Sequence, residues 1–585
     1  VLLLNRDNGM QMTVAAEVAT ALSYCTSFRT LGEHAEMLVS TIPQLHNQLA
    51  DVTAVLTAVR ESGILLTAQA VCERLYPATP PEASLAPTRA CIITCDRPAA
   101  VQRLLDSMLA QGRLAGHDKL FLVDDSREPH NAEQNRELVA RFNLTSPETM
   151  YYVGAAAQRS LVQQLVAARP PDRAAVQFLL DRQRWASRPS YGLARTVCLL
   201  LTVGYRCIVL DDDVLFRCVK PPAAGEGISF GGGGNRELAC YGSEEQLMQQ
   251  AVYLDDDPLS GHARYLGMPL ARAIAELGVG RRDQASLHGV NASLLNSLHT
   301  DSPVLVTQCG SWGDPGTVGS NWFYHLGRDS IRRILASPGG LAGAAENRYY
   351  WLGRTRPNIG KMAVMSQATG LDNSKLLPPY FPVFRSEDYL FASMVWFLHP
   401  RAAVLDCNWS IPHLPLEQRG RGPGQAGAAA RGGLGLCGRY LADRAEHITG
   451  VSAPTRLTQL ALLIRQYSEC EPTELVARFR TELARERAGQ LQELGRKLQQ
   501  APQLGSAEWQ GFLHSASSAV ASALQSPASI LDIPGVADEV DEEALLAQAQ
   551  GVMGEFSTAL EAWPGMRESA AAITGRMLAS GEFVA

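Results

Sequence analysis

The sequence predicts an α/β protein built around a mainly parallel sheet. Three short apolar segments each end in polar or acidic residues, and they read RACIITCDRP, KLFLVDDS and RCIVLDDD. Segments with helical periodicity separate them. Strands that alternate with helices form a parallel sheet that is covered by helices on both faces. The 585 residues are too many for one hydrophobic core, so we expect about three domains.

Composition places the chain among soluble globular proteins. Hydrophobic residues make up 46% and charged residues 19%, and the net charge of −7 argues against a nucleic-acid partner. The twelve cysteines form no CxxC pair, as expected for reduced thiols. The apolar run TVCLLLTVGY has ten residues, half of a bilayer span, and VLLLNRDNGM lacks a signal-peptide pattern. We therefore expect a cytoplasmic protein without a transmembrane segment.

Composition shifts divide the chain into four parts. Residues 1–80 are expected to form a mostly helical accessory domain, and the Pro-rich segment 76–87 ends it. Its helix followed by GILL resembles the end of a winged-helix module, with a helical docking domain as the alternative. The α/β domain spans 88–418, the Gly/Arg-rich stretch 419–438 is a flexible loop or linker, and 439–585 form a helical domain.

Within the α/β domain, each predicted element has its own signal. AAVQRLLDSMLAQG and YGLARTVCLLLTVGY have the apolar spacing of helices. GISFGGGGN and CGSWGDPGTVGSNWF are too rich in glycine for element interiors and are predicted to be loops. SEDYLFASMVWF begins a helix with Ser386 as its N-cap, and CNWSIPHLP follows a further strand.

Polar residues gather where the predicted strands end. They are Thr94 to Arg97, then Asp124 with Asp125, and then Asp211 to Asp213. Ligands of open α/β sheets bind beyond the carboxyl ends of the strands. These three groups therefore predict a ligand site at one edge of the sheet.

Three adjacent aspartates repel one another unless something neutralises them. Alternation along a strand would point Asp211 and Asp213 the same way and Asp212 the other way. Two converging carboxylates suit a hard divalent cation such as Mg²⁺ or Mn²⁺. The alternative is a solvated charge cluster. The second triplet, 255–257, precedes Pro258 and is interpreted as a structural turn or helix start.

These motifs together resemble the nucleotide-sugar half of GT-A fold glycosyltransferases, nearest the family-2-like type with a DxD motif. The strands ending TCDRP, VDDS and LDDD, with the helix YGLARTVCLLL, carry the resemblance over 88–220, and a weaker part covers 380–415. It implies a Rossmann-like domain that binds a nucleotide-diphosphate sugar as donor.

The resemblance also assigns roles to individual residues. It puts Mn²⁺ or Mg²⁺ on Asp213, with Asp211 and His413 as further ligands. The donor nucleotide and diphosphate would contact the other polar residues of this edge, namely Thr94, Asp96, Arg97, Asp124, Asp125, Arg195, Asp211 and Asp212. For Arg195, an ion pair on the helix surface is the alternative. Arg419, Arg421 and Arg431 in the Gly/Arg-rich stretch would close over the diphosphate.

Two further positions concern the acceptor and the donor sugar. The resemblance makes Asp388 the general base that deprotonates the acceptor hydroxyl, with Glu387 as the alternative. Ordinary helix capping competes with this role. Trp312 would stack on the donor sugar, which the GGGGN run at 231–235 would border. A packed core tryptophan is the competing interpretation.

The sequence thus predicts a metal-dependent glycosyltransferase that moves a sugar to a glycan, lipid-linked glycan or protein acceptor, with inversion and with retention as the alternative. The C-terminal helices could form a homodimer or clamp a long acceptor. The alternatives are a catalytically degenerate scaffold and a nucleotidyltransferase. The second would carry a Gly-rich basic loop after its first strand, where this chain has TCDRPAAV.

Overall fold

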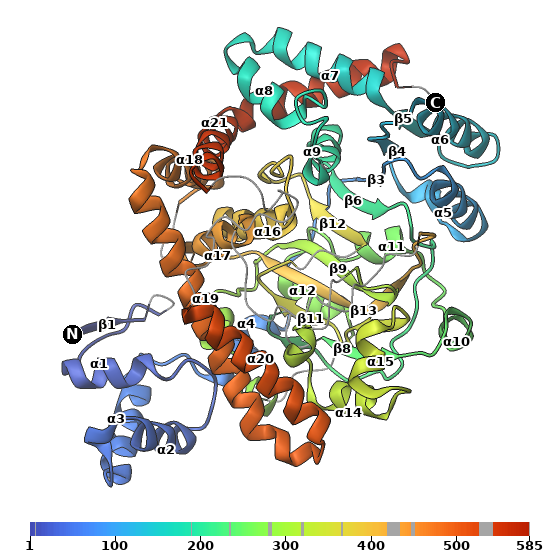
Figure 1. The fold of residues 1–585 in the computed structure, drawn as a ribbon. Coiled ribbons are helices and arrows are strands. Elements are labelled where there is room, and N and C mark those ends of the chain that lie inside the picture. The colour runs from blue at the N-terminus through green and yellow to red at the C-terminus, as the bar shows by residue number, and fades with distance from the viewer. Residues whose placement is uncertain are drawn as a thin grey trace.

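The computed structural model describes residues 1–5, 8–188, 190–232, 236–278, 284–316, 321–363, 367–417, 433–445, 451–525 and 542–583. Within these residues a sheet of eleven strands forms the centre of the molecule, and helices pack around it (Figure 1). The α/β class is confirmed. The sheet is mixed, with a parallel half and a half that contains antiparallel pairs.

The N-terminal unit contains a hairpin as well as helices. Its elements are β1 (Leu2–Leu4), β2 (Gln11–Thr13), α1 (Ala16–Ser23), α2 (Leu31–Thr41), α3 (Leu49–Glu61) and α4 (Ala68–Leu75). GILL (63–66) forms no strand, so the winged-helix likeness is not borne out there, whereas the expected helices are present. Gly63 follows α3 with a φ of 77°, and the Thr67 side chain caps α4, so this segment is a connection between two helices.

The parallel half of the sheet has the strand order β5-β4-β3-β6. Its strands are β3 (Thr88–Thr94), β4 (Lys119–Asp124), β5 (Met150–Val153) and β6 (Arg206–Asp211). On one face pack α5 (Pro98–Gln111) and α6 (Pro129–Asn143), and on the other α7 (Ala155–Ala168), α8 (Arg173–Leu180) and α9 (Tyr191–Leu201). The chain changes faces between β5 and β6, so β3 and β6 flank the switch point of the sheet.

In the described residues, the other half is built from seven strands, and of these only the start of the last one along the chain, the strand predicted before CNWSIPHLP, was expected from the sequence. They are β7 (Ser229–Phe230), β8 (Glu237–Cys240), β9 (Val304–Gly313), β10 (Tyr350–Gly353), β11 (Asn358–Gly360), β12 (Ala368–Asp372) and β13 (Ala403–His413). The loop predicted at CGSWG is wrong, because these residues end β9. A Cβ on Gly310 would lie 2.3 Å from Ser410 Oγ and 2.9 Å from Gly353 Cα. Glycine is therefore needed where three strands approach closely.

The helices of this half are α10 (Glu244–Gln249), α11 (Pro258–Ala263), α12 (Leu270–Glu276), α13 (Ala292–Asn296), α14 (Arg328–Ala336), α15 (Gly340–Glu346) and α16 (Glu387–Leu398). The second aspartate triplet is structural, as predicted. Asp257 caps α11, and its Oδ1 accepts hydrogen bonds from the backbone N–H groups of Leu259 at 2.9 Å and Ser260 at 3.0 Å.

In the described residues from 433 onward the regular elements are all helices, as predicted, with α17 (Leu434–Ala445), α18 (Ala453–Glu469), α19 (Pro472–Gln500), α20 (Ala507–Gln525) and α21 (Glu542–Ser580). The mobile stretch expected at 419–438 is wrong at its end, because buried Leu434 and Leu436 start α17. Helix α21 packs on α7, α8 and α9 (Figure 1), and Trp563 Nε1 donates to the Leu377 carbonyl at 2.6 Å. These helices therefore share a core with the sheet.

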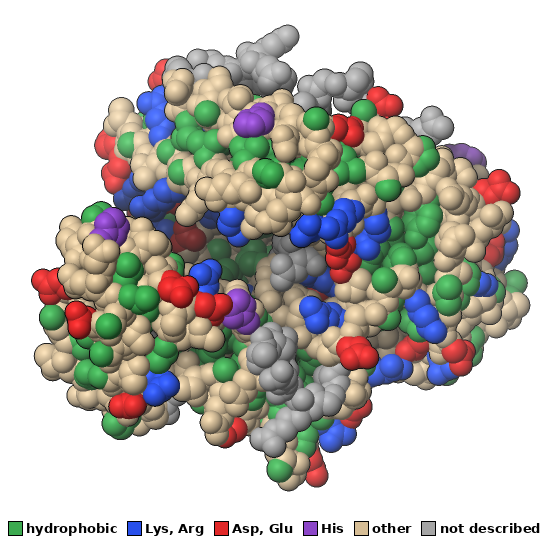
Figure 2. Space-filling view, turned by 90° about the horizontal axis from the view of Figure 1, so that it is seen from below, with side chains coloured by type: hydrophobic (Ala, Val, Ile, Leu, Met, Phe, Trp, Pro, Cys, Tyr) green, Lys and Arg blue, Asp and Glu red, His purple; other side chains and the backbone are tan. Residues whose placement is uncertain are grey.

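The surface has a local basic region although the net charge is −7. Figure 2 shows a hollow near the centre of the lower face, with Lys and Arg side chains gathered around it. Across the described ranges, we find no helix with the length and apolar character to span a bilayer.

Candidate active site

The switch point between β3 and β6 brings two predicted residues into contact. Thr94 at the end of β3 donates from Oγ1 to Asp212 Oδ2 at 2.6 Å. Both side chains are buried, with exposed fractions of 5% and 4%. The carboxyl ends of adjacent parallel strands form the floor of ligand sites in α/β sheets. The Thr94–Asp212 bond therefore marks the centre of the candidate site.

The three aspartates divide between two arginines in a way that the expected alternation does not predict, so that expectation is wrong. Asp211 pairs with Arg195 of α9 at 3.3 Å. Asp212 and Asp213 instead share the guanidinium of Arg97, at 3.4 Å and 3.1 Å. Strand β6 ends at Asp211 and the chain turns, which removes the alternation. The repulsion within the triplet is therefore relieved in part by two arginines.

His413 closes the site from the end of β13. Its Nε2 lies 3.0 Å from Asp213 Oδ1, and its Nδ1 contacts the Asp314 carbonyl. A carbonyl only accepts, so Nδ1 carries a proton there and Nε2 faces the carboxylate. The backbone N–H of Leu414 donates to the Asp213 carbonyl at 3.0 Å, which holds the residues that follow β13 beside those that follow β6.

A second charged group lies beside the triplet, on the α9 side of the sheet. Burial opposes the charge of Arg195, but the carboxylates of Asp211, Glu387 and Asp388, together with Tyr380, raise its pKa. Arg195 thus forms an ion pair with Asp211 at the end of β6 and has only an electrostatic link to the acid pair in the first turn of α16. The sequence could not show that one arginine lies within electrostatic reach of both.

Close packing of α9 produces this link. The backbone N–H of Gly192 in α9 donates to the Pro382 carbonyl at 3.2 Å. A Cβ on Gly192 would lie 1.9 Å from the Phe381 carbonyl oxygen. Only glycine lets α9 approach the segment that leads into α16. The sequence carried a signal for this, because an isolated glycine in a helix often has a packing role.

Backbone strain is concentrated around the site. Four non-glycine residues in the described ranges have a left-handed φ, and three of them, Asp96, Phe384 and Ser386, border the site residues. Such strain persists where the surroundings enforce it, often at functional sites. Ser386 occupies the N-cap position of α16, but with a φ of 71° its side chain makes no capping bond. The predicted capping hydrogen bond is therefore wrong.

Two buried carboxyl groups at the site hold protons more tightly than usual. Burial and the neighbouring charge of Asp388 raise the pKa of Glu387 to about 7, although Arg195 opposes this. Burial and Asp213 raise the pKa of Asp212 to about 7. A carboxyl group that titrates near neutral pH is suited to proton transfer.

Replacing Glu387 by glutamine is expected to stabilise the fold at pH 8. The raised pKa means that the folded state binds the proton more tightly, so native stability falls as pH rises from the ordinary value of 4.5 to about 7. Glutamine mimics the protonated form and avoids this loss, which is about 3 kcal/mol for this shift. Thermal unfolding at pH 4 and pH 8 checks this. The prediction is contradicted if the gain in stability of the Gln variant over the parent is no larger at pH 8 than at pH 4.

Three predicted nucleotide-binding carboxylates serve as local supports in this structure. Both Asp96 oxygens accept from the backbone N–H of Arg127, at 3.2 Å. Asp124 is 1% exposed, and its Oδ2 accepts from the Tyr152 hydroxyl at 2.8 Å. Asp125 pairs with Arg182 at 2.7 Å. They order the loop after β4, and their contact with a base stays a prediction.

The donor-sugar role expected for Trp312 is wrong. The ring is 1% exposed, and its Nε1 donates to the Leu247 carbonyl at 3.1 Å. Trp312 packs with Trp351 in a small core, so the competing interpretation holds. Arg419, Arg421 and Arg431, and residues 233–235 of the glycine run, lie outside the described residues.

Comparisons with protein families, curated proteins and solved structures give no match to this chain. Within the described ranges, we find no group of three or more His, Cys, Asp or Glu side chains arranged to hold a metal.

Proposed function

We propose that the protein is a metal-dependent glycosyltransferase that uses a nucleotide-diphosphate sugar as donor. One observation carries the proposal. The switch point of the sheet gathers Asp211–Asp213 and His413, and Arg195, which pairs with Asp211, feels the charge of the Glu387–Asp388 pair. A candidate base thus lies within electrostatic reach of the proposed donor site.

The strand order supports a nucleotide-binding sheet. Numbered along the chain, β3, β4, β5, β6, β9, β12 and β13 take the spatial order 3-2-1-4-6-5-7. The first four repeat the order 3-2-1-4 of dinucleotide-binding sheets, where ligands sit at the switch point between strands 1 and 4. This order supports a nucleotide site at the switch point, and the GT-A assignment itself rests on the DxD motif that lies there.

The residues present fit a divalent ion with two protein ligands. Mg²⁺ is usually held by one or two carboxylates plus substrate phosphates, so a three-residue protein cage is not required. Asp213 supplies a carboxylate and His413 an Nε2 whose ring is oriented by the Asp314 carbonyl, as is usual for metal-bound histidine. Ligand atoms 3.0 Å apart match neighbouring positions around an ion with bonds of about 2.1 Å. When bound, the ion would neutralise the leaving diphosphate.

The arginines provide the remaining positive charge. Arg97 is 30% exposed and holds Asp212 and Asp213, so it lies where a donor diphosphate would enter. Arg195 is 14% exposed and orients Asp211. Guanidinium groups bind phosphate oxygens in pairs of hydrogen bonds, which positions the donor before reaction.

Asp388 and Glu387 are proposed to receive the proton from the acceptor hydroxyl. Asp388 is half-buried, whereas Glu387 is buried with an exposed fraction of 7%. We assign the base role to Asp388 because it is the more accessible of the two. Glu387 has a pKa of about 7, so its protonation state then sets how much negative charge lies beside Asp388.

Donor binding tests the proposal through Asp213. We expect Asp213→Asn to weaken Mn²⁺-dependent binding of a nucleoside diphosphate about 10- to 100-fold, the usual cost of disturbing a metal site. Isothermal titration calorimetry with uridine and guanosine diphosphates, with and without Mn²⁺, measures this. Turnover is measured separately, as the rate of hydrolysis of each nucleotide sugar in a panel.

The second triplet supplies a matched control. Asp255→Asn changes an aspartate in the same sequence motif, but Asp255 is fully exposed at the surface. This variant should bind and hydrolyse as the parent does. Equal behaviour of the Asp213 and Asp255 variants would refute the proposed metal site, and the absence of any nucleotide binding would refute the donor class.

A further inference from the structure

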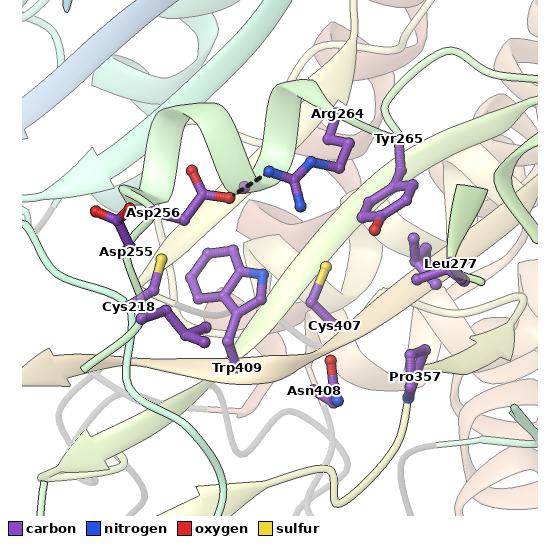
Figure 3. A pocket seen from close by; sticks show the side chains of 13 residues that line it. Cys218, Asp255, Asp256, Arg264, Tyr265, Leu277, Pro357, Cys407, Asn408 and Trp409 are labelled. Carbon is purple, nitrogen blue, oxygen red and sulfur yellow. Dashed lines mark hydrogen bonds and ion pairs between the residues drawn. The ribbon is translucent and has the colours of Figure 1, made fainter. Parts of the chain in front are cut away.

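A second site lies on β13, away from the triplet. A cavity of about 320 Å³ opens beside the middle of this strand (Figure 3). Leu405, Cys407 and Trp409 face it and belong to the core under α5 and α6, whereas Val404 belongs to the core under α9 and α16. The cavity is therefore on the face of the sheet opposite the Glu387–Asp388 pair.

The strand is irregular where it lines the cavity. Between Asp406 and Ser410, four steps along β13 match only two steps along β9, from Gln308 to Gly310. A bulge of this kind re-aims side chains and is common beside binding sites. Here it sets Cys407, Asn408 and Trp409 in succession on the cavity wall (Figure 3).

The aromatic part of the lining is rigid. Helix α11 lies directly on Trp409, because a Cβ on Gly261 would be 2.9 Å from its indole ring. His262 adds an edge-to-face contact with a centroid distance of 4.9 Å. Tyr265, half-buried, faces the cavity from just beyond α11 (Figure 3). Fixed rings lose little conformational freedom when a ligand binds.

The polar part of the lining is nearly neutral in charge. Asp256 and Arg264 form an ion pair at 2.6 Å across the cavity rim, and the half-buried amide of Asn408 lies opposite (Figure 3). Asp255 lies 3.7 Å from Arg113. Paired charges disfavour a strongly ionic ligand, yet they offer several hydrogen-bond donors and acceptors.

We propose that this cavity is a carbohydrate-binding site that holds a neutral sugar unit. Trp409 is 8% exposed, so it offers only the part of its ring that lines the cavity, whereas Tyr265 is half-buried. These electron-rich ring surfaces attract the polarised C–H groups of a sugar ring. The Asp256–Arg264 pair and the Asn408 amide suit neighbouring hydroxyl groups. The volume falls within the range of small-molecule sites, about 300–1,000 Å³.

This inference goes beyond the proposed function, because binding here needs neither donor nor metal. The sugar held at this site is not the one transferred. Trp409 is four residues before His413 on β13 and lies on the face of the sheet opposite the Glu387–Asp388 pair, so a bound glycan would be tethered while another part of it reacts. The site would raise the local concentration of a long acceptor.

Saturation-transfer difference NMR on the full chain tests the proposal. The probes are the methyl glycosides of glucose, galactose, mannose and N-acetylglucosamine, without nucleotide or metal. At least one should receive saturation at its ring C–H protons. Arg264→Ala, at an exposed position, and Asn408→Ala should each weaken its binding at least fivefold.

Asp213→Asn serves as the matched control and should bind the same glycoside as the parent does. A signal that survives both the Arg264 and the Asn408 substitutions would overturn the assignment, as would the absence of a signal from all four glycosides. Transfer of saturation to uridine or adenosine, and not to the glycosides, would overturn it too. None of these results depends on transferase activity, so the two proposals fail separately.

Discussion

Replacing Asp388 by asparagine is expected to lower kcat about 10²- to 10⁴-fold, the contribution of a positioned general base. The amide keeps the shape of the first turn of α16 but cannot accept a proton. Asp388 adds to the charge that raises the pKa of Arg195, so it lies within the electrostatic reach of the donor side. Donor binding should change little, because the lost interaction belongs to the acceptor hydroxyl. Steady-state kinetics with a donor identified by hydrolysis measures this.

The control separates a catalytic base from a helix-capping acid. Asp329 is the second residue of α14, as Asp388 is of α16, and it is exposed. Asp329→Asn removes an acid from a helix start at an equivalent position, at a cost of about 0.3–1 kcal/mol in stability and none in rate. If the two variants lost the same stability and neither lost turnover, Asp388 would be a capping residue and not the base.

Replacing Gly192 by alanine is expected to destabilise the fold by at least about 3 kcal/mol, the upper end of overpacking effects. The new methyl group would meet the Phe381 carbonyl oxygen at 1.9 Å. This oxygen belongs to the backbone, so it cannot rotate away as the end of a side chain could. Helix α9 would move away from the segment before α16 and take Arg195 with it. Variant protein that still folds should therefore lose about 10²-fold in kcat.

A glycine in open space provides the comparison. Gly489 lies inside α19, and a Cβ there would meet nothing within 4 Å. Gly489→Ala should stabilise the protein by up to about 1 kcal/mol, because alanine is the better helix former. Thermal unfolding of both variants gives the two shifts. Similar shifts for Gly192→Ala and Gly489→Ala would show that the close contact of α9 is not needed.

The two variants examine different parts of one arrangement. Asp388→Asn tests a single proton acceptor, whereas Gly192→Ala tests whether the base and the donor side must be held together. Arg195 is the common element, because it pairs with Asp211 and feels the charge of the acid pair. A loss of rate in both variants, with donor binding kept only in the first, is the expected pattern.

Local sequence signals were sufficient for three of the four strands of the parallel half. The strands at 88–94, 119–124 and 206–211 are where the apolar runs placed them, and so are helices α5 and α9, whereas β5 was not predicted. Apolar runs bounded by polar residues carry this information without reference to distant residues. Of the other half only the start of β13 was expected, because β9 and β10 contain glycines whose use depends on neighbouring strands.

The α/β class, the edge at which polar residues collect, and the structural role of the triplet at 255–257 could all be read from local sequence patterns. Each depends on residues close together in the chain. The folded arrangement was needed to show that Trp312 is a core residue, that Arg97 and Arg195 divide the aspartate triplet, and that the bulge in β13 lines a second cavity. These features join residues far apart in sequence, so they depend on strand register and helix packing, which local patterns do not specify.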